Sequence, residues 1–434
     1  MSHSRSGQVT TPMKEILVHV GRRTIETAVL ADGQLVEYDM EEAAGGKLAG
    51  NLYLGRVENV LPGMQAAFVN IGLARNAFLY IDDVLHPHLE KQPKKKPSIT
   101  ELLRPGQELI VQIVKEPQGG KGARVTTHYT LPGRYLVYMP HADYVAVSRK
   151  VADDRERERL KEAGERIRQG EEGLILRTAA EGETLERLTE DVEQLRERWN
   201  AIRAKAAVSS APCELHRDDG LMLRLVRDML DAGTDRIWVD DEAAFGELRE
   251  LVGRMAPAKL ECVSLYDSRE TGLFERRGVR AQLEQAFGRE IRLPSGGSLV
   301  WDQTEALTII DVNTGKYVGS TGLEETVFAT NLEAAGEITR LLRLRDTGGI
   351  VLIDFIDMED ETHRAKVEER LAELARRDRT ACHVLGWTRL GLMEMTRKKV
   401  RQDAALRLYE PCPACGGRGV IAAGPGEGRR RDGG

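Results

Sequence analysis

Two aspartates directly follow apolar segments in the last third of the chain. The segment ALTII runs into Asp311, with Asn313 two residues later, and IVLI runs into Asp354, with Asp357 three residues later. In an α/β sheet, ligands bind at the carboxyl ends of the strands. Carboxylates and an amide at such an edge form an oxygen-only site suited to Mg²⁺ or Mn²⁺ and a substrate phosphate. The alternative is that each aspartate only caps the next turn or helix.

A second candidate site is the string CPACGGRG at 412–419. Cys412 and Cys415 have the C-x-x-C spacing of half a tetrahedral zinc site, and the glycines allow backbone amides to face the sulfurs. The sequence has no second C-x-x-C pair, and a second copy of the chain could supply the other two ligands. A redox pair is the competing hypothesis, although the strand and helix of a thioredoxin-like motif are not predicted around it.

Two phenylalanines and a lysine could hold a nucleic acid. Phe68 and Phe78 fall on neighbouring predicted strands, and Lys121 lies in the string GGKG. Aromatic rings on an open barrel face stack on bases for ~1–3 kcal/mol each, and lysine can contact a phosphate. The alternative places both rings in a barrel core. GGKG is not a P-loop, because glycine rather than Ser or Thr follows the lysine.

Arg177 and Thr178 follow the apolar run LIL. A planar guanidinium beside a hydroxyl suits a terminal phosphate, and the competing interpretation is a strand-end arginine in a surface ion pair. The histidines are scattered singly along the chain, so the sequence predicts neither a histidine metal cage nor a Ser-His-Asp arrangement.

The composition is that of a globular protein of about three domains. The chain has 434 residues, with 63 Lys+Arg against 69 Asp+Glu and a net charge of −6, which argues against a general nucleic-acid coat protein. Five scattered cysteines do not form a disulfide framework and indicate a reducing compartment. The polar leader lacks an apolar core, and no window approaches the ~18 apolar residues of a membrane span, so we expect a cytoplasmic protein.

The elements that must position these residues change character along the chain. Strands are predicted at EILVHV and in a hairpin of TIETAVL and QLVEYDM, and four or five short strands over 51–117 predict a small closed barrel with an exposed basic loop at 91–97. The charged segment 155–169 predicts a solvated helix. A helix from 185 onward carries one apolar stripe and is expected to pack on a sheet; the stripe is Leu185, Leu188, Val192, Leu195, Trp199 and Ile202.

The second half of the chain alternates predicted strands and helices, which indicates an α/β unit with a buried sheet. The predicted strands are 236–240, 259–266, 299–303, 306–311, 350–356 and 382–387, and the predicted helices are 243–255, 324–345 and 361–377.

Long strings of this sequence resemble the ribonuclease E/G family of bacterial endoribonucleases. They are NLYLGRVENVLPGMQAAFVNIG, RLPSGG with EALTIIDVNTG, EETVFATNLEAAGEITRLLRLRDTGGIVLIDFIDM, GLMEMTRKK and CPACGGRG. The resemblance covers about 15–420 and implies a multidomain α+β and α/β fold. Its parts would be a disordered leader (1–12), a ribonuclease-H-like subdomain without its own catalysis (13–45 and 224–287), an S1-type OB-fold (46–127), a 5′-sensor region (128–223), a deoxyribonuclease-I-like catalytic subdomain (288–409), a zinc link (410–420) and a disordered tail (421–434).

The resemblance also implies an activity. It is Mg²⁺-dependent cleavage of single-stranded, A/U-rich RNA, with Mn²⁺ as a possible substitute, leaving 5′-phosphate and 3′-hydroxyl ends in rRNA and tRNA processing and mRNA decay. By position, Asp311 and Asp354 match the metal-binding aspartates, and Asn313 matches the asparagine that supports them. The other matches are Phe68, Phe78 and Lys121 for RNA binding, Gly133, Val137, Arg177 and Thr178 for a 5′-monophosphate, and Cys412 and Cys415 for a zinc shared between two protomers.

Two departures from the family pattern limit this transfer. Thr380 and Ala381 follow Asp378-Arg379 where the family commonly has a basic residue, which leaves the strength of 5′ discrimination open. The sequence ends soon after the zinc link, without a small C-terminal domain or a long degradosome scaffold arm, so we expect a zinc-linked homodimer and leave a tetramer open. The rival functions are a noncatalytic RNA-binding adaptor and a zinc-linked structural oligomer.

Overall fold

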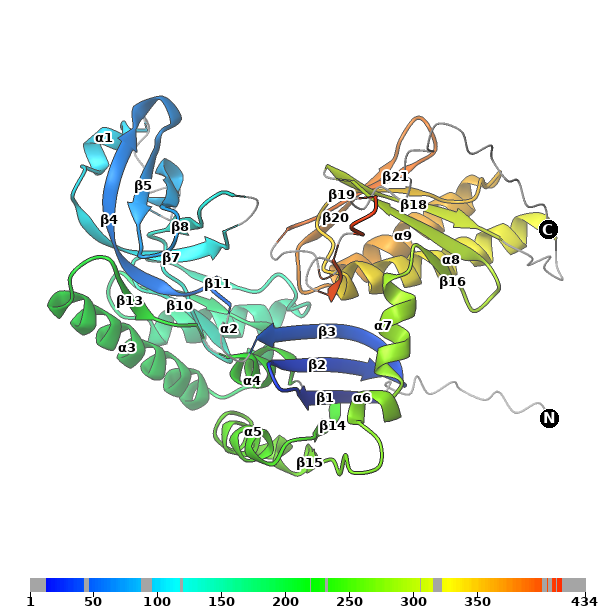
Figure 1. The fold of residues 1–434 in the computed structure, drawn as a ribbon, viewed down its shortest axis with the longest axis horizontal. Coiled ribbons are helices and arrows are strands. Elements are labelled where there is room, and N and C mark those ends of the chain that lie inside the picture. Colours follow the sequence, from blue (N-terminus) through cyan, green and yellow to red (C-terminus); the bar gives the residue numbers. More distant parts are fainter. Residues whose placement is uncertain are drawn as a thin grey trace. The chain divides into compact units, whose positions relative to one another are not determined.

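The computed structural model describes residues 13–42, 47–86, 96–117, 120–218, 220–230, 233–304, 306–314, 322–399, 404, 408–410 and 412–415. The chain divides into two compact units, Met1–Leu283 and Glu284–Gly434, which are described separately (Figure 1). The predicted disordered leader and tail lie outside the described residues, as does most of the predicted basic loop. Within the described part of the chain, no helix has both the length and the apolar composition needed to cross a membrane.

The first unit contains a five-stranded sheet in the order β15-β14-β1-β2-β3. The predicted hairpin is confirmed, and Asp32 and Gly33 form its turn with φ of 48° and 79°, as a tight hairpin turn requires. The predicted strand at 259–266 is shorter than expected, because 257–262 form a 3-10 helix that begins at Pro257. The strands are β1 (Lys14–Val20), β2 (Thr24–Ala31), β3 (Gln34–Glu42), β14 (Thr234–Val239) and β15 (Val263–Leu265).

Apolar side chains from these strands form one core with the helix α5 (Glu242–Met255). Ile16, Val18 and Ile237 of the sheet are buried in the same cluster as Leu248 and Val252 of the helix. β1 pairs in parallel with β14, so segments from distant parts of the sequence lie side by side in this sheet (Figure 1). The remaining short elements near this sheet are α4 (Leu221–Arg224), a π-helical turn (Leu225–Met229) and α6 (Leu273–Arg276), and α7 (Val279–Phe287) crosses the division between the units.

The predicted small barrel is present. Five strands follow the order β4-β5-β6-β8-β7, and β4 also pairs with β7, which closes the barrel, while β13 adds to β4 on the outside. Its interior is apolar and includes the fully buried Val69, Leu79 and Val125. The elements are β4 (Leu52–Leu61), β5 (Ala66–Asn70), β6 (Ala77–Tyr80), α1 (Ile99–Leu102), β7 (Glu108–Lys115), β8 (Arg124–Thr126) and β13 (Cys213–His216).

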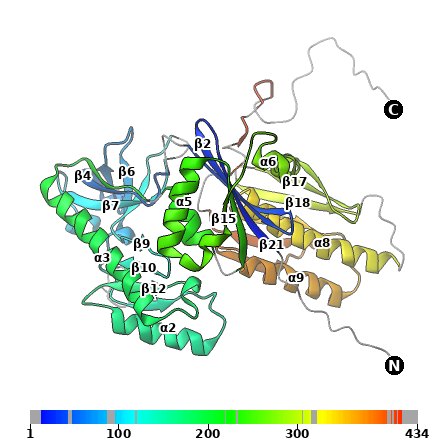
Figure 2. The same cartoon turned by 90° about the horizontal axis from the view of Figure 1, so that it is seen from below.

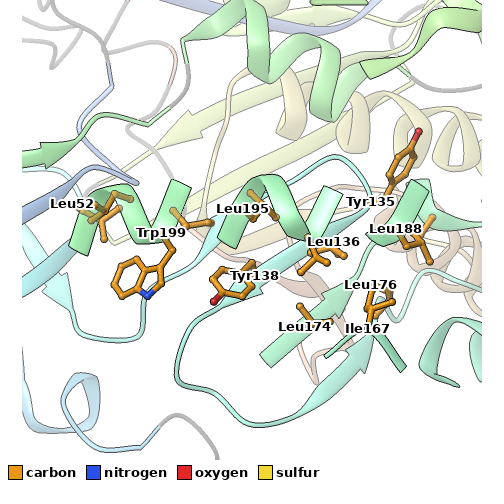
Figure 3. Packing of buried hydrophobic residues seen from close by; sticks show 14 of the residues in the cluster. Leu52, Tyr135, Leu136, Tyr138, Ile167, Leu174, Leu176, Leu188, Leu195 and Trp199 are labelled. Atoms are coloured by element: carbon orange, nitrogen blue, oxygen red, sulfur yellow. The ribbon is translucent and has the colours of Figure 1, made fainter. Parts of the chain in front are cut away.

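A four-stranded sheet in the order β11-β12-β10-β9 follows the barrel along the chain. The apolar stripe predicted from residue 185 onward is confirmed, since Leu188, Leu195 and Trp199 pack against β10 (Figure 3). The elements are β9 (Leu131–Pro132), β10 (Leu136–Met139), β11 (Val145–Val147), α2 (Asp154–Ile167), β12 (Gly173–Leu176) and α3 (Leu185–Val208).

The prediction that 155–169 form a simply solvated helix is wrong. α2 buries Leu160 and Ile167 against β11 and β12. A Cβ on Gly164 would lie 2.6 Å from a methyl carbon of Val145, so the absence of a side chain there lets the helix approach the sheet. A few apolar residues at helical spacing are therefore sufficient to bury one face of this highly charged helix.

The second unit is built on a six-stranded sheet in the order β16-β17-β18-β19-β21-β20. β18 and β19 run parallel, and the other neighbouring strands are antiparallel. The helices α8 and α9 pack together alongside this sheet (Figure 2). The elements are β16 (Glu290–Arg292), β17 (Ser298–Gln303), β18 (Leu307–Asn313), α8 (Leu323–Leu344), β19 (Gly349–Asp354), α9 (Glu361–Arg376), β20 (Cys382–Trp387) and β21 (Met393–Arg397).

This sheet is buried on one face, so the prediction of a buried sheet holds for half of its side chains. Ile310 and Ile353 are fully buried, whereas Ile309 and Ile350, which point to the other face, are 42% and 50% exposed. Successive side chains of a strand point to opposite faces, so each strand contributes to both surfaces. Asp311 of β18 and Asp354 of β19 therefore each lie on either the buried or the open face of this sheet.

Candidate functional site

Asp311 and Asp354 lie side by side at the carboxyl ends of β18 and β19. The register of the parallel pair places Asp311 directly beside Asp354. By strand alternation, Asp311 shares a face with Ile309, and Asp354 shares a face with Ile350, so both carboxylates are on the open face of the sheet. The sequence predicted that the two acids follow strands, and the structure brings them together.

Asn313 supports this acid pair directly. Its amide Nδ2 donates a hydrogen bond to Oδ2 of Asp311 at 2.8 Å. Burial raises the pKa of Asp354, and the negative charges of Asp311 and Asp357 raise it further. The alternative of simple capping does not account for this repulsion between carboxylates.

The donor set at this edge fits a hard divalent cation. Among the described residues, no group of three or more His, Cys, Asp or Glu side chains converges as a metal cage. Mg²⁺ needs no such cage, because it commonly takes one or two carboxylates and completes its shell with water and substrate phosphate. Bound there, it would also relieve the repulsion that raises the pKa of Asp354.

Sequence reasoning missed a buried asparagine next to this site. Asn331 of α8 is fully buried, donates to the backbone oxygen of Ile356 at 2.8 Å and accepts from its N–H at 3.1 Å. Ile356 lies between Asp354 and Asp357, so one side chain fixes the backbone that carries both acids. The available signal was an amide on the face of a predicted helix that its apolar residues mark as buried.

The two barrel phenylalanines form a cross-strand pair. Phe68 of β5 lies opposite Phe78 of β6, with ring centroids 6.0 Å apart and the ring planes at 66°. Both rings are half-buried, whereas their neighbours Val69 and Leu79 are fully buried in the barrel. The structure therefore disfavours the core alternative. Lys121 is exposed, and two residues after it Ala123 accepts a hydrogen bond from the N–H of Phe78.

Three of the four residues matched to a 5′-phosphate pocket meet at the strands β10 and β12. Arg177 Nη1 donates to the backbone oxygen of Gly133 at 2.7 Å, and Val137 pairs with the strand that leads into Arg177. Thr178 is exposed immediately after Arg177. A Cβ on Gly133 would lie 2.5 Å from a carboxylate oxygen of Asp191, so this position requires glycine.

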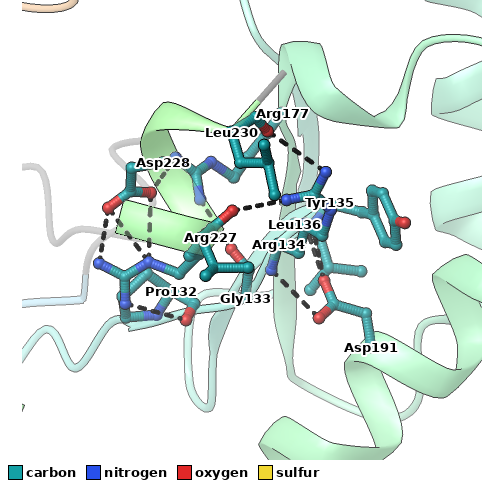
Figure 4. A network of polar contacts seen from close by, with 11 residues as sticks. Pro132, Gly133, Arg134, Tyr135, Leu136, Arg177, Asp191, Arg227, Asp228 and Leu230 are labelled. Carbon is teal, nitrogen blue, oxygen red and sulfur yellow. Dashed lines mark hydrogen bonds and ion pairs between the residues drawn. The ribbon is translucent and has the colours of Figure 1, made fainter. Parts of the chain in front are cut away.

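Arg177 is also part of a larger network of charges, shown in Figure 4. Its Nη2 lies 2.6 Å from Oδ1 of Asp228, so the competing interpretation of an ion pair is correct for the contacts in this structure. The half-buried Asp191 accepts hydrogen bonds from the backbone N–H groups of Arg134, Tyr135 and Leu136 at 3.2, 2.8 and 3.1 Å. These hydrogen bonds hold the backbone beside Gly133 and the side chain of Arg177 in place.

The Cys412–Cys415 segment is arranged to favour a thiolate. Hydrogen bonds from the backbone of Cys415 and Ala414 and from the thiol of Cys415 lower the pKa of Cys412. Cys412 is exposed, and Cys415 is half-buried. A deprotonated pair of this spacing fits two of the four ligands of a zinc ion. Of the predicted zinc link at 410–420, the structure describes only Glu410 and residues 412–415.

Comparison with known proteins gives a consistent result across the chain. The sequence profile described as "Ribonuclease E/G family" matches residues 130–400. The chain is 41% identical over 414 residues to Ribonuclease G of Haemophilus influenzae, covering 94% of this chain and 84% of that protein. The same identity holds over 413 residues with Ribonuclease G of Escherichia coli K12, again over 94% and 84% of the two proteins. Ribonuclease E of Nostoc sp. is 40% identical over 407 residues, which are 93% of this chain and 58% of that protein.

Proposed function

The chain belongs to the ribonuclease E/G family, and we propose that it is a Mg²⁺-dependent enzyme that cuts single-stranded, A/U-rich RNA internally. The family makes it an endoribonuclease, a phosphodiester hydrolase of RNA processing and decay that requires a divalent metal. Under the proposal the products end in a 5′-phosphate and a 3′-hydroxyl, and the physiological substrates are rRNA and tRNA precursors and mRNA.

The observation that carries this proposal is the placement of Asp311 and Asp354 in register on an open sheet face. The two carboxylates would hold Mg²⁺, and Asn313 would keep the Asp311 carboxylate in a fixed orientation through its amide hydrogen bond. When bound, Mg²⁺ polarises the scissile phosphate and lowers the pKa of a coordinated water.

The polypeptide's part in the reaction is to fix geometry and charge. Asp311 and Asp354 would hold the cation that binds the phosphodiester at the sheet edge, and Asn331 would keep the segment after Asp354 from moving. Attack by water forms a new P–O bond and breaks the P–O3′ bond, which accounts for the proposed product ends. Because the acids lie on the open face, an extended single strand can reach them.

The remaining sites would bind the rest of the RNA and a second protomer. Phe68 and Phe78 would stack on bases while Lys121 contacts a phosphate. Arg177, Thr178, Gly133 and Val137 would receive a 5′-monophosphate. Cys412 and Cys415 would share one Zn²⁺ with the same pair of a second copy, giving a homodimer.

The subdomain assignments are part of the same proposal. The strands from 13–45 and 224–287 form the ribonuclease-H-like part, 46–127 the S1-type OB-fold, 128–223 the 5′-sensor region, 288–409 the deoxyribonuclease-I-like catalytic part and 410–420 the zinc link. The pairing of β1 with β14 and the closure of β4 on β7 support this division.

Cleavage of one RNA by two matched variants tests the proposal. Asp354→Asn should lower kcat on a 5′-monophosphorylated, A/U-rich oligonucleotide by at least about a hundredfold, because it removes one of the two carboxylates that would hold the metal. Asp302→Asn is the control, since Asp302 is an exposed carboxylate on β17 that pairs with Arg289 at 2.7 Å. Equal activity of the Asp354 variant and wild type would exclude the proposed site.

The two rival functions predict other results in the same samples. A noncatalytic adaptor binds the oligonucleotide without turnover by the wild-type protein. A zinc-linked structural oligomer loses its assembly on chelation and has negligible affinity for the RNA throughout.

A further inference from the structure

Asp228 and two arginines meet beside the proposed 5′ pocket. The π-helical turn Leu225–Met229 presents Asp228 to Arg177, whose Nη2 lies 2.6 Å from Oδ1 of the carboxylate. π-helical turns are rare and often occur at functional sites. The neighbouring Arg227 contacts both carboxylate oxygens, with distances of 3.1, 3.2 and 2.8 Å (Figure 4).

The two aspartates of this network have different partners. The guanidinium groups of Arg177 and Arg227 both contact the carboxylate of Asp228. Asp191 accepts hydrogen bonds from three backbone N–H groups. Arg134 Nη1 donates a hydrogen bond to the backbone oxygen of Val226 at 2.6 Å. Asp228 is therefore the carboxylate that directly neutralises Arg177.

Arg177 can separate from Asp228 without leaving the Asp228 carboxylate buried and uncompensated. The side chains of Arg177 and Asp228 are 27% and 26% exposed, so an anion in solvent can reach the contact. Arg227 is 6% exposed and would still hold both oxygens of Asp228 after Arg177 had turned away. Burial opposes ionisation of Asp228, but Arg227 and Arg177 lower its pKa to about 2, so it is an anion at every physiological pH.

We infer that Asp228 gates the proposed 5′ pocket by competing with the RNA 5′-phosphate for Arg177. This inference rests on the proposed function, because it assigns a regulator to that pocket. A 5′-phosphate binds in place of the Asp228 carboxylate, and its apparent affinity falls by the fraction of molecules in which Arg177 is already engaged. An RNA with a 5′-hydroxyl has no terminal phosphate for Arg177 to bind, so its affinity does not depend on Asp228. Asp228 thus sets how large the advantage of a phosphorylated end can be.

The test is equilibrium binding of two RNAs that differ only at the 5′ end. Fluorescence anisotropy with a 3′-labelled A/U-rich oligonucleotide, in buffer without divalent cations, measures Kd for the 5′-monophosphate and 5′-hydroxyl forms. Asp228→Asn should lower Kd for the phosphorylated RNA by about fivefold, the upper range for losing a partly exposed ion pair. Kd for the hydroxyl form should not change. Asp228→Glu retains the charge and should behave as wild type, and Asp228→Ser provides a second variant without the carboxylate.

A matched ion pair elsewhere in the same unit provides the control. Asp143 lies 2.6 Å from Arg168, with side chains 21% and 26% exposed, close to the values of the Asp228–Arg177 pair. Asp143→Asn should leave both Kd values unchanged. If Asp228→Asn lowers Kd equally for both RNAs, or lowers it for neither, Asp228 does not regulate the 5′ pocket.

Arg177→Ala separates failure of the gate from failure of the pocket. If this variant loses the preference for the phosphorylated RNA while Asp228→Asn has no effect, the proposed pocket is supported and its regulation by Asp228 is excluded. If Arg177→Ala retains the full preference, both the proposed pocket and its regulation by Asp228 are excluded.

Discussion

Each unit contains neighbouring parallel strands whose carboxyl ends carry a pair of polar side chains, and the two pairs differ in charge. At the ends of β1 and β14, His19 Nδ1 lies 2.5 Å from Oδ2 of Asp240. At the ends of β18 and β19, Asp311 lies beside Asp354. The first pair can neutralise itself through one proton. The second pair concentrates like charge and would gain stability from a bound cation.

The two pairs therefore differ in their side chains and not in the geometry of their strands. Both ends satisfy the rule that ligands bind at the carboxyl edge of parallel strands. The proposed chemistry is confined to the second unit because its side chains leave negative charge uncompensated, as the raised pKa of Asp354 reports.

The backbone around the acid pair should depend strongly on Asn331. Asn331→Leu leaves the buried N–H and oxygen of Ile356 without their partner, at a cost of ~2–4 kcal/mol in the free energy of unfolding. Urea denaturation measures this loss, and kcat should fall in the surviving folded protein while KM for RNA stays close to wild type. A variant with wild-type stability and kcat would show that the acids do not need this support.

The arginine network should fail in a different manner. Gly133→Ala places a Cβ 2.5 Å from a carboxylate oxygen of Asp191 and pushes that carboxylate away from its three backbone N–H donors. We expect a loss of ~1–3 kcal/mol in stability and of the preference for a 5′-monophosphate. Cleavage of 5′-hydroxyl RNA, measured in parallel, should persist. Loss of all cleavage would contradict the separation of the two sites.

The barrel provides an uncharged surface for the same comparison. Phe68→Ala and Phe78→Ala should each weaken RNA binding by ~1–3 kcal/mol, because each removes a ring on which a base can stack. Titration of a single-stranded oligonucleotide measures the effect, and its salt dependence should not change, since no charge is lost. Unchanged affinity in both variants would return these rings to a purely structural role.

The His19–Asp240 pair should make a smaller, pH-dependent contribution. The hydrogen bond to Asp240 raises the pKa of His19 despite the opposing effect of burial, and the charge of Glu26 raises it further while Arg280 opposes it. Because the pKa is higher in the folded protein, the stabilisation is fully present below about 6.5 and is lost as pH rises through the raised value. Urea denaturation should therefore show His19→Asn destabilised more at pH 5.5 than at pH 8.5. An equal difference at both pH values would contradict this origin.

The sequence was sufficient to find the acids but not their arrangement. Asp311 and Asp354 each follow an apolar run, a local pattern, and the resemblance to the family names the same residues. That they share a register and an open face depends on strand pairing between segments some forty residues apart, which no local pattern encodes. The pairing of β4 with β7, which closes the barrel, also joins distant segments and is not encoded by a local pattern. The sequence predicted the barrel only from the number of short strands.

The residues that sequence reasoning missed depend on contacts between distant segments. Asn331 shows its role only through Ile356, and Asp228 shows its role only through Arg177, which lies on another element. β21 was not predicted, because MEMTR alternates apolar with polar residues over only five positions. Its antiparallel pairing with β19 stabilises the strand in spite of that weak signal.

If the open-face acid pair hydrolyses RNA with a divalent metal, cleavage must depend on that metal. Purified protein is treated with a chelator, incubated with a 5′-monophosphorylated, A/U-rich RNA, and then supplied with Mg²⁺, with the chemical ends of the products mapped at each stage. The account predicts no cleavage after chelation, and internal cuts with 5′-phosphate and 3′-hydroxyl ends once Mg²⁺ is restored. Cleavage that continues after chelation, or products that end in a 2′,3′-cyclic phosphate, would contradict it.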